Sequence, residues 1–236
     1  LLIMKKIAAI LAGGVGKRLN SELPKQFMLL AGKPMIVYSL EAFQHHAAID
    51  EIALVVPSDY VNKCEIYKKD FSKLTHIIAG GEERYLSTLA VLNTYQNNTE
   101  DHIILHDAAR PMVTVKMIDE IINALKDHKA ATVAIKTTDT IVQSLNHATI
   151  SGTFDRSTLY NVQTPQAFKI SVLKQAYQLA LKDPCFIATD DTAVVFNYLP
   201  DEKIAIVAGS PYHIKLTYQE DIQLMEEYMR KKNKRL

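Results

Sequence analysis

The sequence lacks several residues and patterns on which whole classes of protein depend. It contains no tryptophan and only two cysteines among its 236 residues. Cys64 and Cys185 lie far apart and belong to no C-x-x-C pair, which argues against a disulfide framework and favours a reducing compartment. No run of residues approaches the roughly 18 apolar residues of a membrane-spanning helix. We therefore expect a cytoplasmic protein with no membrane partner.

An excess of charge of one sign is also missing. The 27 basic and 26 acidic residues leave a formal net charge of +1. This balance provides no bulk attraction to nucleic acid or to an anionic membrane, so we expect neither as a partner. A small anionic ligand would have to be bound by cations placed locally. No linker or internal repeat divides the chain, and we expect one domain over residues 4–236, counted from Met4.

Short apolar runs alternate with segments of helical periodicity over most of the chain. The run KIAAILA, residues 6–12, ends in two glycines and has the continuous apolar character of a strand buried on both faces of a sheet. Alternation of such strands with helices predicts a doubly wound, mostly parallel, Rossmann-like α/β sheet. The predicted strands are 6–12, 51–57, 75–80, 102–108 and 203–209, and the predicted helices are 34–46, 59–71, 83–95, 115–128, 171–182, 190–199 and 217–236.

This alternation breaks down in the second half of the chain. Residues 131–144 are rich in β-branched side chains, residues 148–168 are rich in turn formers, and a short polar connection joins them. We predict a protruding β-arm at about residues 137–160. A long ribbon with few core residues is only marginally stable alone, so the arm is expected to pack on another surface, of which a second subunit is one option.

The first predicted strand leads into LAGGVGKRLNSELPKQF, residues 11–27. This loop lacks the Ser or Thr that follows Gly-Lys in a Walker A loop, and it lacks the third glycine of the Rossmann fingerprint. Its glycines would still let backbone N–H groups approach an anion closely. The loop favours a nucleotide, and a solvated basic loop is the alternative. The candidate contacts are Gly13, Gly14, Gly16, Arg18 and Lys25.

A second glycine pair ends another predicted strand, in GGEERYLST, residues 80–88. Gly80 and Gly81 precede a helix, and Ser87 lies one turn after Glu83. A helix N-terminus with a nearby hydroxyl and guanidinium can recognise a base edge or a ribose. The alternative is an ordinary left-handed turn with capping.

The segment HDAARP, residues 106–111, ends a further strand. Asp107 is a hard oxygen ligand suited to Mg²⁺, and Arg110 is placed to meet a phosphate. A structural Asp–Arg pair is the alternative. We disfavour His106 as a general base, because no Ser or Cys nucleophile is paired with it in the sequence. The pair Asp190-Asp191 could form a second acidic site, but it is more simply an N-cap and a first-turn acid.

The candidate site thus combines strand-end glycines, separated cations and one metal-suited carboxylate, without a protein nucleophile. Two further cations are Arg156, in the predicted arm, and Lys215, after the last strand. This set fits attack by a substrate's own phosphate on the α-phosphate of a nucleotide. Such chemistry depends on in-line positioning and on stabilisation of charge at the pentacoordinate phosphorus.

At this point the residues resemble a known family, the cytidylyltransferases that make CDP-linked polyol phosphates. One branch acts on 2-C-methyl-D-erythritol 4-phosphate in isoprenoid synthesis by the non-mevalonate pathway, and a sister branch acts on ribitol 5-phosphate. The resemblance covers essentially the whole chain and implies a nucleotidyltransferase that uses CTP and Mg²⁺. It is carried, in order, by LAGGVGKRLNSELPKQF, GGEERYLS, HDAARP, TTDTIV, QTPQAF and HIKLT.

The resemblance also implies roles for individual residues. The glycines would wrap the CTP phosphates, the cations would stabilise the transition state, and the arm residues would reach across a homodimer. The residues so implied are Ala12, Gly13, Gly14, Gly16, Gly80, Gly81 and Ser87 for the nucleotide; Arg18, Lys25, Arg156 and Lys215 for catalysis; Asp107, Arg110, Thr140, Arg156, Thr164 and Lys215 for the polyol phosphate; and Asp107 for Mg²⁺.

Two acceptors remain open within this resemblance. Ala12-Gly13-Gly14 and Leu159-Tyr160 are closer to the ribitol branch, as is the segment 138–142, whereas Thr189-Asp190-Asp191 resembles the methylerythritol branch. His213 stands where both branches usually have Asn. We predict 2-C-methyl-D-erythritol 4-phosphate as the acceptor, with D-ribitol 5-phosphate as the alternative.

Two other functions are compatible with the pattern. One is a sugar-1-phosphate nucleotidyltransferase that uses UTP or GTP. The other is a nucleotide-binding dimer without activity, against which the joint presence of Arg18, Lys25 and Asp107 argues.

Overall fold

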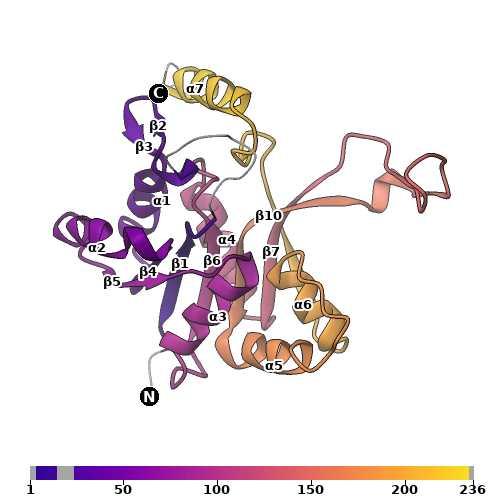
Figure 1. The fold of residues 1–236 in the computed structure, drawn as a ribbon, viewed down its shortest axis with the longest axis horizontal. Coiled ribbons are helices and arrows are strands. Elements are labelled where there is room, and N and C mark those ends of the chain that lie inside the picture. Colours follow the sequence, from indigo (N-terminus) through magenta and orange to yellow (C-terminus); the bar gives the residue numbers. More distant parts are fainter. Residues whose placement is uncertain (1–3, 15–23, 234–236) are drawn as a thin grey trace.

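The structure is a computed structural model that describes residues 4–14 and 24–233. Its centre is a seven-stranded sheet with the order β11-β7-β10-β6-β1-β4-β5 (Figure 1). Only β10 runs antiparallel to its neighbours within this sheet, so the prediction of a mostly parallel α/β fold is confirmed. The strands are β1 (Lys6–Leu11), β4 (Glu51–Val56), β5 (Leu74–Ala79), β6 (His102–Asp107), β7 (Ala130–Lys136), β10 (Tyr160–Lys169) and β11 (Ile204–Ala208).

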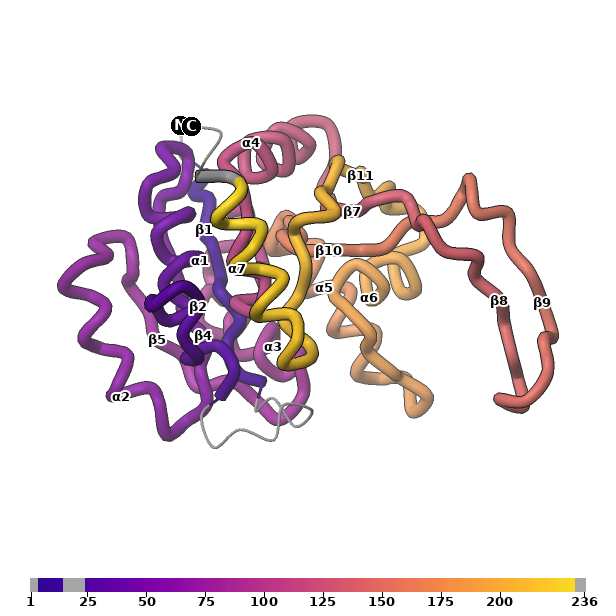
Figure 2. The backbone as a smooth tube through the Cα atoms, turned by 90° about the horizontal axis from the view of Figure 1, so that it is seen from above, coloured from indigo at the N-terminus to yellow at the C-terminus, as the bar shows by residue number. Residues whose placement is uncertain are grey.

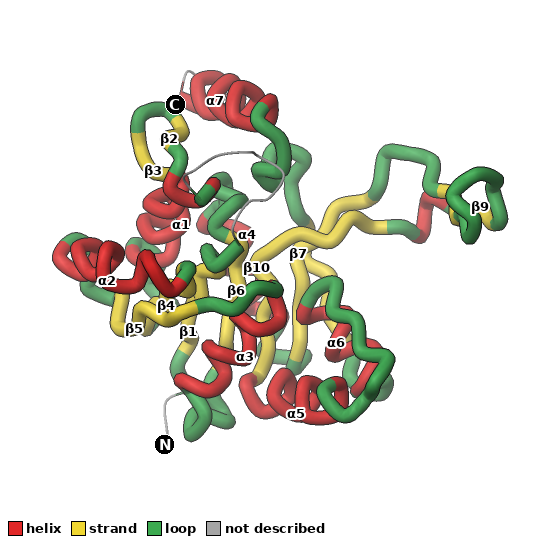
Figure 3. The backbone as a smooth tube through the Cα atoms, in the orientation of Figure 1, coloured by secondary structure: helices red, strands yellow, loops and turns green. Residues whose placement is uncertain are grey.

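Both faces of the sheet are covered by helices, because its central strands are apolar on both sides. In β1, Ala8 and Ile10 belong to one buried apolar cluster, whereas Ile7 and Ala9 belong to another on the opposite face. Such continuous apolar strands are typical of parallel sheets. The two layers are visible in Figures 2 and 3. One layer contains α1 (Met35–Gln44), α2 (Val61–Cys64) and α4 (Val115–Ala124), and the other contains α3 (Arg84–Thr94), α5 (Ile170–Ala180) and α6 (Asp191–Tyr198).

The helix predicted over residues 59–71 is wrong as a single element. The structure instead has the 3₁₀ helix η2 (Ser58–Tyr60), the single turn α2, and the 3₁₀ helix η3 (Glu65–Lys69). The side chains that pack on the core from this segment include Val61, Cys64 and Tyr67, which recur every three residues. Side chains at i and i+3 superimpose in 3₁₀ geometry, so this spacing favours short 3₁₀ turns over a continuous α-helix.

The order of the strands reverses at β1. The chain proceeds from β1 to β4 and β5 on one side, and β6 pairs with β1 on the other side. Ligands of open α/β sheets bind outside the carboxyl ends of the strands at such a switch point. Gly13 and Gly14 follow the end of β1, and Asp107 is the last residue of β6. The fold therefore places two of the predicted motifs at one binding edge.

The C-terminal helix α7 (Glu220–Asn233) lies beside the short strands β2 (Leu29–Leu30) and β3 (Lys33–Pro34) (Figure 1). Leu30 and Met35 share a small buried cluster with Leu216 and Met225. This cluster brings the segment after β11 beside the short sheet of β2 and β3. Within the described ranges, neither α7 nor any other helix is long and apolar enough to cross a membrane.

The predicted arm is present as an antiparallel ribbon that projects from the sheet (Figures 1 and 3). It continues β7 and β10, and its tip contains β8 (Val142–Gln143) paired with β9 (Gly152–Thr153). Large apolar side chains on it face solvent, with Leu145 78% and Ile150 67% exposed.

Candidate functional site

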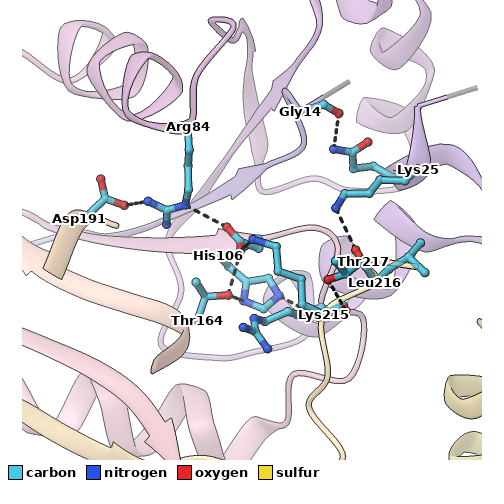
Figure 4. A network of polar contacts seen from close by, with 12 residues as sticks. Gly14, Lys25, Arg84, His106, Thr164, Asp191, Lys215, Leu216 and Thr217 are labelled. Carbon is cyan, nitrogen blue, oxygen red and sulfur yellow. Dashed lines mark hydrogen bonds and ion pairs between the residues drawn. The ribbon is translucent and has the colours of Figure 1, made fainter. Parts of the chain in front are cut away.

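A polar pocket lies at the carboxyl edge of the sheet, at the switch point beside β1. Its lining comes from the turn after β1, the start of α3, the end of β6 and the segment before α7. Figure 4 shows the polar contacts around it. The lining residues are Leu11, Gly13, Gly14, Lys25, Gln26, Gly81, Glu82, Glu83, Arg84, Ser87, Asp107, Ala109 and Lys215.

Two glycines let the turns after β1 and β5 approach each other. A Cβ on Gly80 would lie 2.7 Å from Ser87 Oγ and 3.3 Å from the Cα of Gly13, and a Cβ on Gly13 would lie 2.9 Å from the same hydroxyl. Ser87 is buried and reaches the pocket between them. The backbone N–H of Ala12 donates to Val55 O at 2.7 Å and is therefore occupied by the sheet.

Asp107 is the charged centre of the pocket. Its Oδ2 accepts a hydrogen bond from Lys215 Nζ at 2.6 Å, and its Oδ1 accepts one from Arg84 Nε at 3.2 Å. Burial alone would raise the pKa of Asp107, but the charges of Arg84 and Lys215 outweigh burial and hold it well below its ordinary value. The carboxylate is ionised and paired with two cations.

Arg84 contacts a second carboxylate that sequence analysis did not connect with this site. Its Nη1 pairs with Asp191 Oδ2 at the start of α6, and Asp191 Oδ1 accepts a hydrogen bond from Tyr177 Oη at 2.6 Å. Asp191 is completely buried. Asp190 is the N-cap of α6, as predicted, and accepts a hydrogen bond from Ala193 N–H at 2.7 Å.

Behind Asp107 lies a buried group of hydrogen-bonded residues. Thr164 Oγ1 accepts the N–H of Asp107 at 3.1 Å and lies 3.3 Å from His106 Nδ1, and its carbonyl lies 2.6 Å from His213 Nε2. Burial lowers the pKa of His106 to about 3 and that of His213 to about 4. Both rings are neutral, and a pKa of about 3 makes the buried His106 too weakly basic to serve well as a general base.

Arg110 extends from the same buried group. Its Nη1 donates to His213 O at 2.8 Å, and its buried Nε has no hydrogen-bond partner among the described residues. Thr164 and Arg110 therefore lie beside Asp107 but do not line the pocket.

The segment that contains Lys25 closes another side of the pocket. Lys25 Nζ donates to the carbonyl of Leu216, the residue after Lys215, at 2.9 Å. Gln26 Nε2 donates to Gly14 O at 2.8 Å and so supports the glycine turn. Sequence analysis overlooked Gln26, although its position directly after Lys25 was the available signal.

Four further predicted residues are not among those that line the pocket in the described part of the chain. Gly16 and Arg18 are outside the described residues. Thr140 and Arg156 belong to the exposed arm, where Arg156 Nη1 donates to Thr138 O at 3.2 Å. Neither side chain lines the pocket of its own chain.

Asp107 is the buried carboxylate in the pocket lining, whereas Glu82 and Glu83 of the same lining are exposed. Among the described residues, no group of three or more His, Cys, Asp and Glu side chains is arranged to hold a metal. Mg²⁺ is commonly bound by one or two carboxylates together with substrate phosphates and water. Asp107 fits that donor set, provided that a phosphate-bearing ligand supplies the other oxygens.

The family can be assigned from comparison of the whole chain. The family model "2-C-methyl-D-erythritol 4-phosphate cytidylyltransferase" matches residues 6–231. The chain belongs to this family. The match includes the glycine turns, Asp107 and Lys215, so the pocket lies within the family's common region.

Individual relatives of this cytidylyltransferase chain agree with the family match. The 2-C-methyl-D-erythritol 4-phosphate cytidylyltransferase of Lachnoclostridium phytofermentans is 38% identical over 96% of this chain and 97% of its own length. The bifunctional ribulose 5-phosphate reductase/CDP-ribitol pyrophosphorylase Bcs1 of Haemophilus influenzae is 40% identical over 94% of this chain but only 48% of its own length. The solved 4-diphosphocytidyl-2C-methyl-D-erythritol synthase of Anaerococcus prevotii superposes with a TM-score of 0.84 at 29% identity, covering 96% of this chain and 99% of that one.

Proposed function

We propose that this protein transfers CMP from CTP to 2-C-methyl-D-erythritol 4-phosphate and releases pyrophosphate. The observation that carries this proposal is the position of Asp107, which meets Arg84 and Lys215 directly beside the glycine turn at the switch point. Membership of the family supplies the substrates. The arrangement provides anion-binding backbone, cations and one metal ligand at a single edge of the sheet.

The nucleotide is assigned to the side of the pocket formed by β1 and α3. Backbone groups of Gly13 and Gly14 are suited to the CTP phosphates, because glycine permits close approach of a ligand. Gly81 and Ser87 belong to the lining beside the glycine turn, before and within the first turns of α3, and are assigned to the base and ribose. The close approach of the turns after β1 and β5, at Gly13 and Gly80, limits the width of the nucleotide side of the pocket.

We propose that Asp107 holds Mg²⁺ together with CTP phosphate oxygens. When bound there, the ion would neutralise developing charge on the phosphates. Each Asp107 oxygen accepts one hydrogen bond from a cation and keeps a further lone pair. Because Mg²⁺ would repel both cations, we expect one of them to move when the metal binds.

The reaction needs no protein nucleophile. A phosphate oxygen of the acceptor attacks the α-phosphorus of CTP, the bond between that phosphorus and the bridging oxygen to the β-phosphate breaks, and pyrophosphate leaves with the electron pair. Lys25 and Lys215 are assigned to stabilise the charge on the reacting phosphate, as is Arg18, which lies outside the described residues. Preorganised donors of this kind each contribute on the order of 10²- to 10³-fold in rate.

The acceptor is assigned to Lys215, Arg110 and the arm of a second subunit. The Nε of Arg110 has no hydrogen-bond partner among the described residues but is buried, so Arg110 would have to shift to donate to an acceptor phosphate. The apolar side chains exposed on the arm support a homodimer in which Thr140 and Arg156 reach the partner's pocket. We expect the enzyme to work in the cytoplasm, since both cysteines are free thiols.

Ribitol 5-phosphate is the second candidate acceptor. The observation that favours it is the 40% identity with a protein whose name includes CDP-ribitol pyrophosphorylase activity. The two reactions share the CTP side of the pocket and differ only in the polyol.

The deciding experiment measures pyrophosphate release with CTP and Mg²⁺ for the two acceptors side by side. A higher kcat/KM for 2-C-methyl-D-erythritol 4-phosphate is expected. A higher kcat/KM for D-ribitol 5-phosphate would instead assign ribitol 5-phosphate as the acceptor. UTP and GTP serve as nucleotide controls, and preference for either would refute the cytidylyltransferase assignment.

A further inference from the structure

Asp107 is held by two cations whose own surroundings differ. Arg84 is tied to a second, fully buried carboxylate, Asp191, which is held in turn by the hydroxyl of Tyr177 (Figure 4 shows Arg84 and Asp191). Lys215 has no second side-chain partner within the described part of the chain, and its side chain is 37% exposed. Arg84 is therefore held by two carboxylates, whereas Lys215 is held by one.

We propose that Arg84, Asp191 and Tyr177 are positioning residues, which hold Asp107 in place for the metal, while Lys215 leaves Asp107 and turns to the acceptor phosphate. This inference rests on the proposed function of the pocket. In this proposal the two carboxylate oxygens of Asp107 have different roles. Oδ1 stays on Arg84, and Oδ2 becomes available when Lys215 departs.

The chemistry of the two cations supports this division. The planar guanidinium of Arg84 donates to Asp107 through Nε and to Asp191 through Nη1, so leaving Asp107 would also disturb a buried ion pair. Removing one member of a buried pair is strongly unfavourable, because a charge remains without its partner. The ammonium of Lys215 is a compact charge on a flexible stem and can exchange one anion for another.

The outer members of this chain of contacts are also well fixed. Tyr177 comes from α5 and is 1% exposed, and both burial and the charge of Asp191 raise the pKa of its hydroxyl. Tyr177 is thus protonated and donates to Asp191. A residue in direct contact with a metal ligand, as Arg84 is with Asp107, typically changes metal affinity by about 10- to 100-fold when altered. Tyr177 lies two contacts further out, through Asp191 and Arg84, so a smaller effect is expected from it.

The test compares two tyrosines that make the same kind of contact. Tyr177→Phe removes the hydroxyl that donates to Asp191 at 2.6 Å, and the matched control Tyr198→Phe removes one that donates to Asp183, also at 2.6 Å. Asp183 has no contact with Asp107 among those the structure describes. Both variants of the full chain are first compared by thermal unfolding without ligand.

Calorimetric titration with CTP and Mg²⁺, without acceptor, then measures binding rather than turnover. The dissociation constant is expected to rise for Tyr177→Phe, by less than the roughly tenfold typical of a direct partner of a metal ligand, and to stay unchanged for Tyr198→Phe. With CTP and EDTA, the two variants should bind alike, because the effect acts through the metal ligand. A purely structural role of Tyr177 would weaken binding in both conditions and would overturn the proposal, as would equal behaviour of the two variants with Mg²⁺.

A second variant tests the movement of Lys215. Lys215→Gln is expected to bind CTP with Mg²⁺ at least as tightly as the wild type, since a competitor for Asp107 is removed, while the KM for the acceptor rises. Weaker binding of CTP with Mg²⁺ by Lys215→Gln would overturn the assigned exchange.

Should Tyr177→Phe fail to fold, Asp191→Asn is expected to give the same selective loss of Mg²⁺-dependent binding, and unaltered binding would overturn the proposal. A wild-type protein that binds no CTP would refute the proposed function itself.

Discussion

Lys215 Nζ lies 2.6 Å from Asp107 Oδ2, although 108 residues separate the two in sequence. The contact joins the end of β6 to the segment after β11, on the carboxyl edge of the sheet. It brings the only metal-suited carboxylate of the HDAARP motif against the cation of the HIKLT motif. Two motifs that resemblance alone associates with one site are thus in direct contact.

Asp107→Asn is expected to lower kcat/KM for cytidylyl transfer by about 10²-fold or more, because the metal ligand and the partner of two cations are both removed. Pyrophosphate release measures this change, and circular dichroism checks that the fold is retained. Asp59→Asn is the control, since Asp59 is exposed and follows β4 on the same sheet. Equal activity of the two variants would contradict the role of Asp107.

Gly80→Ala is expected to reduce the free energy of unfolding by about 1–3 kcal/mol, because the added methyl overpacks a buried contact. The new Cβ would lie 2.7 Å from Ser87 Oγ and 3.1 Å from Val55 Cγ1. In the control Gly14→Ala, the closest atom is Gln26 Nε2 at 3.6 Å, so stability should be nearly unchanged. Urea unfolding measures both, and a stable Gly80→Ala variant would argue against the close approach of the two turns.

The exchanged arm predicts complementation between two inactive variants. Arg156→Ala damages the arm and Lys215→Ala damages the pocket. If each site takes its arm from the partner, a mixed dimer contains one site with both changes and one intact site. Co-expression of the two variants should then restore about a quarter of wild-type activity, since half of randomly assorted dimers are mixed.

Analytical sedimentation tests the same arm exchange by measuring the oligomeric state. Deletion of residues 145–157 should give a monomer that still binds CTP but turns over poorly. An intact dimer after the deletion, or no recovered activity in the mixed preparation, would contradict the arm exchange.

His213 is expected to make the free energy of unfolding depend on pH. Burial lowers its pKa from 6.5 to about 4, and the charge of Arg110 acts in the same direction, although hydrogen bonds to the backbone of Thr164 and Met112 and the charge of Asp107 oppose it. Between these values the unfolded chain binds a proton that the folded chain does not, so acidification destabilises the fold, by up to about 1.4 kcal/mol per pH unit.

His213→Asn should remove this contribution and flatten the decline in stability between about pH 6.5 and about pH 4. Urea unfolding across this range measures the slope. Burial also lowers the pKa of His106, to about 3 with His213 present, so some pH dependence will persist in the variant. An unchanged slope would show that His213 is not the titrating group.

Much of the fold could be predicted because its signals are local. The apolar run of β1 and the two glycines that follow it are adjacent in sequence, and they indicated both a buried parallel strand and a ligand edge. The segment at residues 59–71 was predicted wrongly because its apolar spacing of three residues suits both an irregular α-helix and 3₁₀ turns. Packing against the core decides between these two forms.

The amino-acid sequence by itself determined the alternation of strands and helices, the glycine turns, the metal-suited Asp107 and the β-arm, because each depends on neighbouring residues and on hydrophobic periodicity. Only the tertiary structure decided that Arg84 joins Asp107 to Asp191, and that Tyr177 holds Asp191 from α5. These contacts connect residues as far as 107 positions apart. These contacts form because β6, α3, α5 and α6 pack together and bring the four side chains within reach. No local sequence pattern encodes that packing.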